Sequence, residues 1–269
     1  MLSVDDYLEI RPVPRLVRYV ECYWSRNDLH GTPQHRVLPD GCVDILFSTL
    51  DGEPISLAVV GLMTVPQVLD VSPGQSFFGV RFRPGMATAF MPAAPQLNDR
   101  IEPLENVLGS EARHLFDKLG DEASSPLEMA RLMDTTLRPL KPPDNGQNAL
   151  DHLLSDVDSI EHVAKAAALS TRQLRRLCVE RAGVSPKYLK RILRFRKAIQ
   201  KISALGADST PDWADVAAVC GYYDQAHFIR EFQEFAGSTP GRYLQSRPTR
   251  SPYNPDHEPS TTRESDRLR

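Results

Sequence analysis

The sequence predicts an α+β protein with a small β-barrel or sandwich-like N-terminal domain with helices. An all-α domain follows, in which a long helix joins two helix-turn-helix motifs. Short apolar runs between Gly and Pro turns fill residues 1–100, and helical periods fill residues 147–245. Parts of the helical region also repeat at an offset of about 54 residues. We expect an N-terminal domain at 1–140, a helical domain at 147–247 and a disordered tail at 248–269.

Composition is typical of globular proteins. Of the 269 residues, 41% are hydrophobic and 25% are charged. No stretch approaches the roughly 18 apolar residues of a membrane span, and residues 1–6 lack the features of a signal peptide. The four cysteines are far apart, which argues against a disulfide framework and a zinc knuckle. We therefore expect a reduced, cytoplasmic protein with no membrane partner.

Charge is distributed unevenly along the chain. Residues 1–145 hold 13 basic and 20 acidic residues, whereas residues 146–247 hold 15 basic and 11 acidic residues. Between Lys165 and Lys201 there are twelve basic residues and one acid, Glu180. A solvated helix face usually mixes charges of both signs, so this segment indicates a polyanionic partner.

The N-terminal region shows strand and turn signals. Residues 43–47, 56–60 and 77–82 are apolar or alternating runs, and Gly and Pro turns separate them. A helix is expected from Pro14 to Cys22. Helical periods return from about residue 104 to 137, and a linker is expected at 141–146, which is rich in Pro, Asp, Asn and Gly.

Residues 147–245 read as helical throughout. Ser159 is a suitable N-cap, and either Ser170 or Thr171 can cap the helix that follows. Gly183 is a stop signal, and Pro186 occupies a favoured first-turn position. The expected helices are 147–154, 159–168, 172–181, 186–203, 213–220, 224–235 and a short one from 240. In the long helix, apolar residues recur at steps of four and three and form one buried stripe, namely Tyr188, Ile192, Phe195, Ile199 and Ile202.

The internal repeat has a consistent order of parts. In each copy, Val-Ala (163–164 and 216–217) precedes a tight turn, and a second helix ends before Gly-x-Ser/Thr-Pro (183–186 and 237–240). A small residue beside the turn lets two helices cross closely. Such a unit can place its second helix in a DNA major groove, and two units on a rigid connector can read grooves about 34 Å apart. An ordinary helical bundle is the alternative.

At these residues the chain resembles the AraC-type family of transcription activators. The resemblance rests on residues 183–189, 191–198 and 216–243, and it covers about residues 147–245. It implies a sequence-specific DNA-binding transcription regulator whose partner is double-stranded DNA. RNA polymerase, a small-molecule effector and a homodimer partner are further implied. Cys178 stands where the family usually has a large aromatic residue, so we expect looser packing of the first unit. The loop 206–212 is longer than usual, so we expect a changed angle between the units.

The family pattern also implies which residues read bases. Arg suits guanine and Gln suits adenine, whereas Ala226 and Ile229 can only meet thymine methyls or leave the second unit anchored to phosphate. His227 is equally well read as a DNA contact or as a cap or partly buried helix residue. The candidate DNA-binding residues are Ser170, Thr171, Arg172, Gln173, Arg175, Arg176, Lys187, Arg191, Asp224, Gln225, Ala226, Ile229 and Arg230.

The N-terminal region resembles an uncharacterised sensor domain found in one subgroup of these regulators, through residues 36–47 and 79–85. Charged residues lie on or beside its predicted strands, where an unpaired charge is costly to bury. They form an internal ion-pair network, which we favour slightly, or they line a polar ligand pocket. These candidate ligand residues are Arg36, Asp40, Asp44, Arg81 and Arg83.

Two other functions are weighed against a regulator. A cupin-like metal enzyme needs more clustered histidines than His30 and His35, and an alkyl-accepting repair protein with a DNA-binding module would use Cys22 or Cys42. No Gly-rich phosphate loop or Gly-x-Ser-x-Gly motif is present in the sequence. We therefore expect no enzyme activity, no catalytic residue, no cofactor and no metal.

Overall fold

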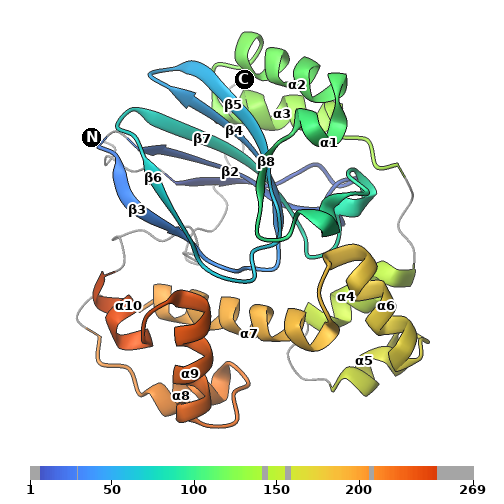
Figure 1. Ribbon diagram of the computed structural model, residues 1–269, viewed down its shortest axis with the longest axis vertical. Helices are drawn as coiled ribbons and strands as arrows, with labels where there is room; N and C mark the ends of the chain where they lie inside the picture. The colour runs from blue at the N-terminus through green and yellow to red at the C-terminus, as the bar shows by residue number, and fades with distance from the viewer. Residues whose placement is uncertain (1–6, 29, 141–144, 155–158, 206–208, 247–269) are drawn as a thin grey trace, which may run out of the picture.

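The computed structural model describes residues 7–28, 30–140, 145–154, 159–205 and 209–246 (Figure 1). The expected tail at 248–269 and most of the expected linker lie outside these ranges. The expected α+β class is confirmed, since a β-rich N-terminal part is followed by a helical part (Figure 1). No helix among the described residues is long and apolar enough to cross a membrane.

The N-terminal part is built on an open sheet of six antiparallel strands. Its order is β1 (Leu8–Ile10), β2 (Val20–Asp28), β7 (Gln75–Phe82), β4 (Val43–Leu50), β5 (Glu53–Val60) and β8 (Ile101–Pro103). The three apolar runs of the sequence are thus strands β4, β5 and β7. The β4–β5 hairpin turns at Asp51-Gly52, where both residues have positive φ as an Asp-Gly hairpin turn requires.

One face of this sheet carries the core. Tyr23, Phe47, Phe78 and Val80 are buried there, beneath α1 (Glu105–Leu108), α2 (Ser110–Asp121) and α3 (Pro126–Thr136) (Figure 1). The Tyr23 hydroxyl donates to Asp134 Oδ1 on α3 at 2.8 Å. The helical periods at 104–137 are therefore confirmed, and they supply the cover that an apolar sheet face needs.

The other face carries polar side chains and a second, smaller sheet. β3 (Thr32–Val37) pairs antiparallel with β6 (Gln67–Val71). Arg26 on β2 reaches this layer, because its Nη2 donates to Thr32 Oγ1 at 3.0 Å. The two layers make the domain sandwich-like, and the large sheet does not close into a barrel because β1 and β8 are its edges.

The expected helix from Pro14 to Cys22 is wrong. Residues 14–19 form turns, and strand β2 begins at Val20. Pro12 and Pro14 have no backbone N–H to donate, and the backbone from Val20 onward pairs with β7 instead. Leu16 is fully buried within these turns.

The C-terminal part consists of seven helices in the ranges described. They are α4 (Asn145–Leu154), α5 (Ile160–Ala166), α6 (Thr171–Ala182), α7 (Pro186–Ser203), α8 (Trp213–Val219), α9 (Gln225–Ala236) and α10 (Pro240–Ser246). α7 passes between the two helix-turn-helix units (Figure 1). Phe195 at its middle is fully buried, with its ring 5.2 Å from that of Phe232 and 5.3 Å from that of Phe235.

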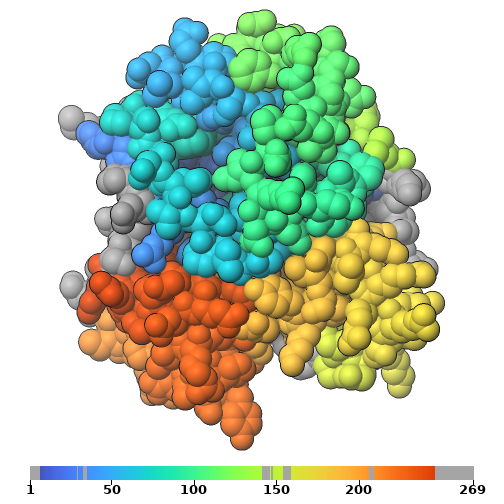
Figure 2. All heavy atoms as spheres, viewed as in Figure 1, coloured from blue at the N-terminus to red at the C-terminus, as the bar shows by residue number. Residues whose placement is uncertain are grey.

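The two parts of the protein touch. In Figure 2 the N-terminal part lies directly on the C-terminal helices, with no open gap between them on this side. Two short 3-10 helices, η1 (Ala87–Ala89) and η2 (Ala94–Leu97), lead from the large sheet toward α6. The shared surface therefore includes one of the helices that the sequence marks for DNA recognition.

Candidate nucleic-acid interface

The first helix-turn-helix unit consists of α5 and α6. Ala164 is buried where the helices meet, and the Leu169 N–H donates to Ala164 O at 2.8 Å to close the turn. α6 begins with a capping box, in which Ser170 Oγ accepts the Gln173 N–H and Gln173 Oε1 accepts the Ser170 N–H at 2.8 Å. The sequence expectation of a cap at Ser170 is confirmed, and these bonds fix where the recognition helix starts.

The second unit, α8 and α9, repeats this geometry. The Tyr222 N–H donates to the O of the buried Ala217 at 2.9 Å, which is the same turn bond as in the first unit. Asp224 Oδ1 accepts the His227 N–H at 2.6 Å and caps α9. Both recognition helices have 12 residues, and α9 begins and ends 54 residues after α6.

The predicted readers on α6 point into solvent. Arg172, Gln173, Arg175 and Arg176 are all exposed, because Leu174 and other apolar positions turn to the core. Gln173 Oε1 is held by the capping box, so its amide NH₂ is the part left to meet a base. Arg176 Nε lies 3.4 Å from Glu180 Oε1 on the same exposed face.

The predicted readers on α9 divide into two groups. Gln225, Ala226 and Arg230 are exposed, whereas Ile229 is half-buried against the core. The His227 ring is partly buried, with its Nδ1 3.4 Å from the Tyr223 backbone N and its Nε2 3.6 Å from Glu231 Oε2. The structure therefore places the His227 ring toward the protein, although the residue stands in the recognition helix.

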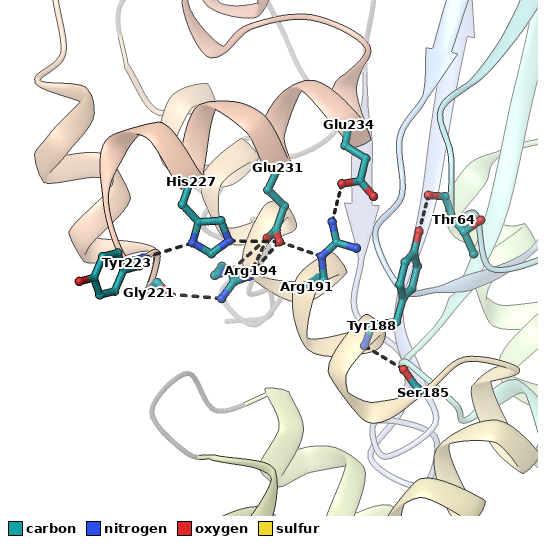
Figure 3. A network of polar contacts seen from close by, with 10 residues as sticks. All are labelled: Thr64, Ser185, Tyr188, Arg191, Arg194, Gly221, Tyr223, His227, Glu231 and Glu234. Carbon is teal, nitrogen blue, oxygen red and sulfur yellow. Dashed lines mark hydrogen bonds and ion pairs between the residues drawn. The ribbon is translucent and has the colours of Figure 1, made fainter.

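A buried carboxylate that the sequence analysis missed joins α9 to α7 (Figure 3). Glu231 is only 4% exposed. Its Oε2 accepts from Arg191 Nε at 2.8 Å, and its Oε1 accepts from Arg194 Nη2 at 2.8 Å. Arg191 also donates to Glu234 Oε2 at 2.5 Å. Arg191, a candidate DNA contact, is thus engaged within the protein. The signal that could have indicated it was an acidic residue, Glu231, among the buried apolar positions of α9, which pack against the basic helix α7.

Between the two units lies a cleft of about 670 Å³. Its lining is mainly basic, and the two carboxylates in it are those that hold Arg191 and Arg194. The lining residues are Ile160, Lys187, Lys190, Arg191, Arg194, His227, Arg230, Glu231 and Glu234. The candidate Lys187 is exposed at the first turn of α7, so the cleft presents cations between the two recognition helices.

Tyr223 is a further candidate that the sequence analysis did not name. It is 92% exposed and directly precedes the cap of α9. A phenol at the start of a recognition helix can donate to a phosphate oxygen. A large aromatic residue inside the turn of the second motif was the available signal.

The five candidate ligand residues of the N-terminal domain separate in the structure. Arg81 lies 3.6 Å from Asp40 Oδ2 and 3.4 Å from Asp44 Oδ2, and Trp24 Nε1 donates to Asp44 Oδ2 at 3.0 Å. Burial raises the pKa of Asp44 to about 6, although Arg81 opposes the shift. Arg36 and Arg83 lie elsewhere: Arg36 contacts α9, and Arg83 lines a groove beside α7.

The two thiols named for alkyl transfer are buried. Burial raises the pKa of both Cys22 and Cys42 well above that of an ordinary thiol. The reactive form of a thiol is the thiolate, which this environment disfavours. Among the residues that the structure describes, no three His, Cys, Asp or Glu side chains gather as metal ligands would.

Comparison with known families places a model on each half of the chain. Residues 8–102 match a family described as a domain of unknown function (DUF6597), and residues 163–246 match one described as a helix-turn-helix domain. A search of curated proteins found no significant match.

Several solved structures are similar to the chain. An AraC-type transcriptional regulator from Chromobacterium violaceum is 21% identical, covering 38% of this chain and 88% of its own, with a TM-score of 0.33. A DNA-binding transcriptional dual regulator from Escherichia coli K-12 is 21% identical, covering 39% and 100%, with a TM-score of 0.33. ToxT from Vibrio cholerae O395 is 10% identical, covering 82% and 96%, with a TM-score of 0.42.

The last third of the chain is a helix-turn-helix DNA-binding domain, because the family match covers both units and the two units have the required caps and turns. Its sequence resembles the AraC type, and it follows residues 8–102, which match a domain of unknown function.

Proposed function

We propose that the protein is a sequence-specific, DNA-binding transcription regulator whose two recognition helices read successive major grooves of one DNA site. The observation that carries this proposal is the pair of equal helices, α6 and α9, which have matching caps and expose polar and basic side chains in their first two turns. α7, which joins the units, has 18 residues and is about 27 Å long at 1.5 Å per residue. That length is of the order of the 34 Å repeat of DNA.

The roles of the helices follow from their exposed residues. Arg172 and Arg176 supply guanidinium groups for guanine edges, whereas the second unit has Ala226 at an exposed position and depends more on Arg230. The basic cleft between the units suits the phosphate backbone that passes from one groove to the next. We expect the first unit to contribute most of the base discrimination.

The finer assignments belong to the same proposal. The N-terminal domain receives a signal, which we expect to be a small-molecule effector, and the bound regulator contacts RNA polymerase. The protein has no catalytic activity and works in the cytoplasm, where the DNA lies. A homodimer would bring four recognition helices to a site, but a single chain already carries two.

The test is selection of a binding site from random double-stranded DNA with the full-length chain, followed by fluorescence anisotropy over a salt series. We expect a defined site with two half-sites about 10 base pairs apart. The logarithm of its affinity should fall with the logarithm of salt concentration, by about 0.9 for each phosphate neutralised. Failure to enrich any sequence, or equal affinity for scrambled DNA, would contradict the proposal.

A matched pair of variants localises the binding. The double variant Arg172→Ala/Arg176→Ala should lose the preference for the selected site. Arg113→Ala/Arg131→Ala removes two exposed arginines, from α2 and α3 of the N-terminal domain, and should bind as the wild type does. Equal loss in both variants would show that net charge, rather than α6, governs binding.

A further inference from the structure

The N-terminal domain contacts both recognition helices through side-chain donors. Asn98, which follows η2, donates from Nδ2 to Ala182 O at 3.1 Å. Arg36, on β3, donates from Nη1 to Ala236 O at 3.0 Å. Ala182 and Ala236 are the last residues of α6 and α9. One domain thus holds the C-terminal ends of both helices.

The two contacts fall on equivalent positions of the internal repeat. Ala236 follows Ala182 by 54 residues, which is the offset between the helices themselves. Each alanine precedes a left-handed glycine, Gly183 with φ 71° and Gly237 with φ 67°. The last carbonyls of a helix have no partner within it, and a cation near them also complements the helix dipole. The N-terminal domain supplies the missing donor at the same point of each helix.

The fit at these ends is close. A Cβ added to Gly183 would lie 2.5 Å from Pro95 O and 2.4 Å from Asn98 Nδ2. A Cβ added to Gly237 would lie 3.3 Å from Arg36 Nη1. The glycines therefore let the N-terminal domain approach the helix ends directly, and the approach is tighter at α6 than at α9.

The two donors are themselves connected within the N-terminal domain. Asp99, next to Asn98, accepts from the Thr64 N–H and from Thr64 Oγ1, each at 2.6 Å. Thr64 lies in the loop that leads into β6, and β6 pairs with β3, where Val68 is opposite Arg36. Thr64 O in turn accepts from the Tyr188 hydroxyl on α7 at 3.1 Å (Figure 3). A displacement of this loop would therefore move both donors together.

We propose that Asn98 and Arg36 are positioning residues for DNA recognition, which set the spacing and the angle between α6 and α9 from outside the helix-turn-helix domain. The inference rests on the proposed function and adds to it two positioning residues that lie outside the helix-turn-helix domain. The base-reading residues lie in the first two turns of both helices, away from the contacted ends, and all of them except the half-buried Ile229 remain exposed. The N-terminal domain thus orients the two helices without covering their reading surfaces.

The test uses the full-length double variant Asn98→Ala/Arg36→Ala on a series of selected sites with one or two base pairs inserted or deleted between the half-sites. Each base pair moves one half-site by about 3.4 Å and turns it by about 35°. We expect the wild type to lose about tenfold or more in affinity for a two-base-pair change, equivalent to about 1.4 kcal/mol. The double variant should lose markedly less, while both proteins prefer the same bases within each half-site.

The control is Asn106→Ala/Arg100→Ala, which removes the same two side-chain types from exposed positions of the N-terminal domain. It should keep the spacing dependence of the wild type. A spacing profile of the Asn98/Arg36 variant identical to that of the wild type would overturn the proposal. A loss of base preference at every spacing would also do so, because it would indicate damage to the units themselves.

A second measurement needs no DNA and separates this inference from the proposed function. Spin labels at Glu180→Cys and Gln233→Cys would report the distance between α6 and α9, since both positions are exposed and the four native cysteines are buried. We expect one narrow distance distribution in the wild type and in the control, and a broad one in the Asn98/Arg36 variant. Equal widths would refute the positioning role even if the protein selected a DNA site, and failure to select a site would leave this result standing.

Discussion

Replacing Glu231 with glutamine should make the protein less stable and, at the same time, a stronger non-specific DNA binder. Glu231 is 4% exposed and pairs with Arg191 and Arg194, so it joins the recognition helix α9 to α7. Glutamine preserves the shape of the side chain but removes the charge that compensates the two cations. The change therefore tests the electrostatic role of the carboxylate rather than its packing.

The magnitude follows from the exposure of the partners. Breaking a fully buried ion pair costs about 3–5 kcal/mol. The side chains of Arg191 and Arg194 are 24% and 21% exposed, so water can partly solvate them, and Arg191 keeps Glu234. We therefore expect the free energy of unfolding to fall by about 2–3 kcal/mol, below the fully buried range. Urea unfolding of the wild type and the variant at neutral pH would measure this difference in the free energy of unfolding.

The DNA result comes from the same cations. Arg191 and Arg194 line the cleft between the units, and without Glu231 they can meet phosphates. Affinity for scrambled DNA at low salt should rise, and the salt slope should steepen by about 0.9 for each new phosphate contact.

The control is Glu234→Gln, which removes an equal charge from a side chain that is 52% exposed. An exposed pair contributes at most about 1 kcal/mol, so this variant should unfold nearly as the wild type does. If Glu231→Gln were as stable as Glu234→Gln, the buried carboxylate would not be what joins the helices.

Three further predictions concern other parts of the molecule. Removing the helix caps, as Ser170→Ala or as Asp224→Ala, should each lower the free energy of unfolding by about 1 kcal/mol in urea. Arg176→Ala should cost about 1–3 kcal/mol at the selected site and leave affinity for scrambled DNA nearly unchanged, and equal weakening on both would make Arg176 a phosphate contact. Because burial raises the pKa of Asp44 from 3.8 to about 6, its folded carboxyl holds a proton that the unfolded chain releases. The free energy of unfolding should therefore fall as pH rises from 4 to 6, by no more than about 3 kcal/mol. The Asp44→Asn variant should not show this pH-dependent fall in the free energy of unfolding. Burial lowers the pKa of His35, which acts in the opposite direction but equally in both proteins, so their difference isolates Asp44.

Features that depend on neighbouring residues were predictable from the sequence. The cap at Ser170, the first-turn proline Pro186, the stop at Gly183 and the long helix between the units all rest on residues within one or two turns of each other, and all are confirmed. The strands at 43–47, 56–60 and 77–82 were also found, because their turns contain the residues that such turns need. The error at Pro14–Cys22 arose where pairing with β7, a distant strand, sets the backbone from Val20 onward.

Features that depend on distant contacts were not predictable. Arg36 was considered as a ligand residue, yet it contacts a carbonyl 200 residues away, and Asn98 contacts one 84 residues away. Neither hydrophobic periodicity nor a local sequence motif indicates contacts between residues so far apart in the sequence. Arg81, Asp40 and Asp44 do lie together, as an internal network would, while the ligand role of the five candidates stays a prediction. Glu231 was missed for the same reason, since its two arginines lie on another helix.

The positions of these distant contacts separate two properties of a DNA reader. In the proposed function, base preference belongs to exposed side chains in the first two turns of α6 and α9, where we expect a substitution to change which base pair is favoured. Spacing preference, as we propose, belongs to buried or shared contacts, namely Glu231 between α7 and α9 and the two donors of the N-terminal domain. We therefore expect the signal proposed for that domain to act on spacing while base preference stays constant. Sites that differ only in the distance between their half-sites would then respond differently to one signal.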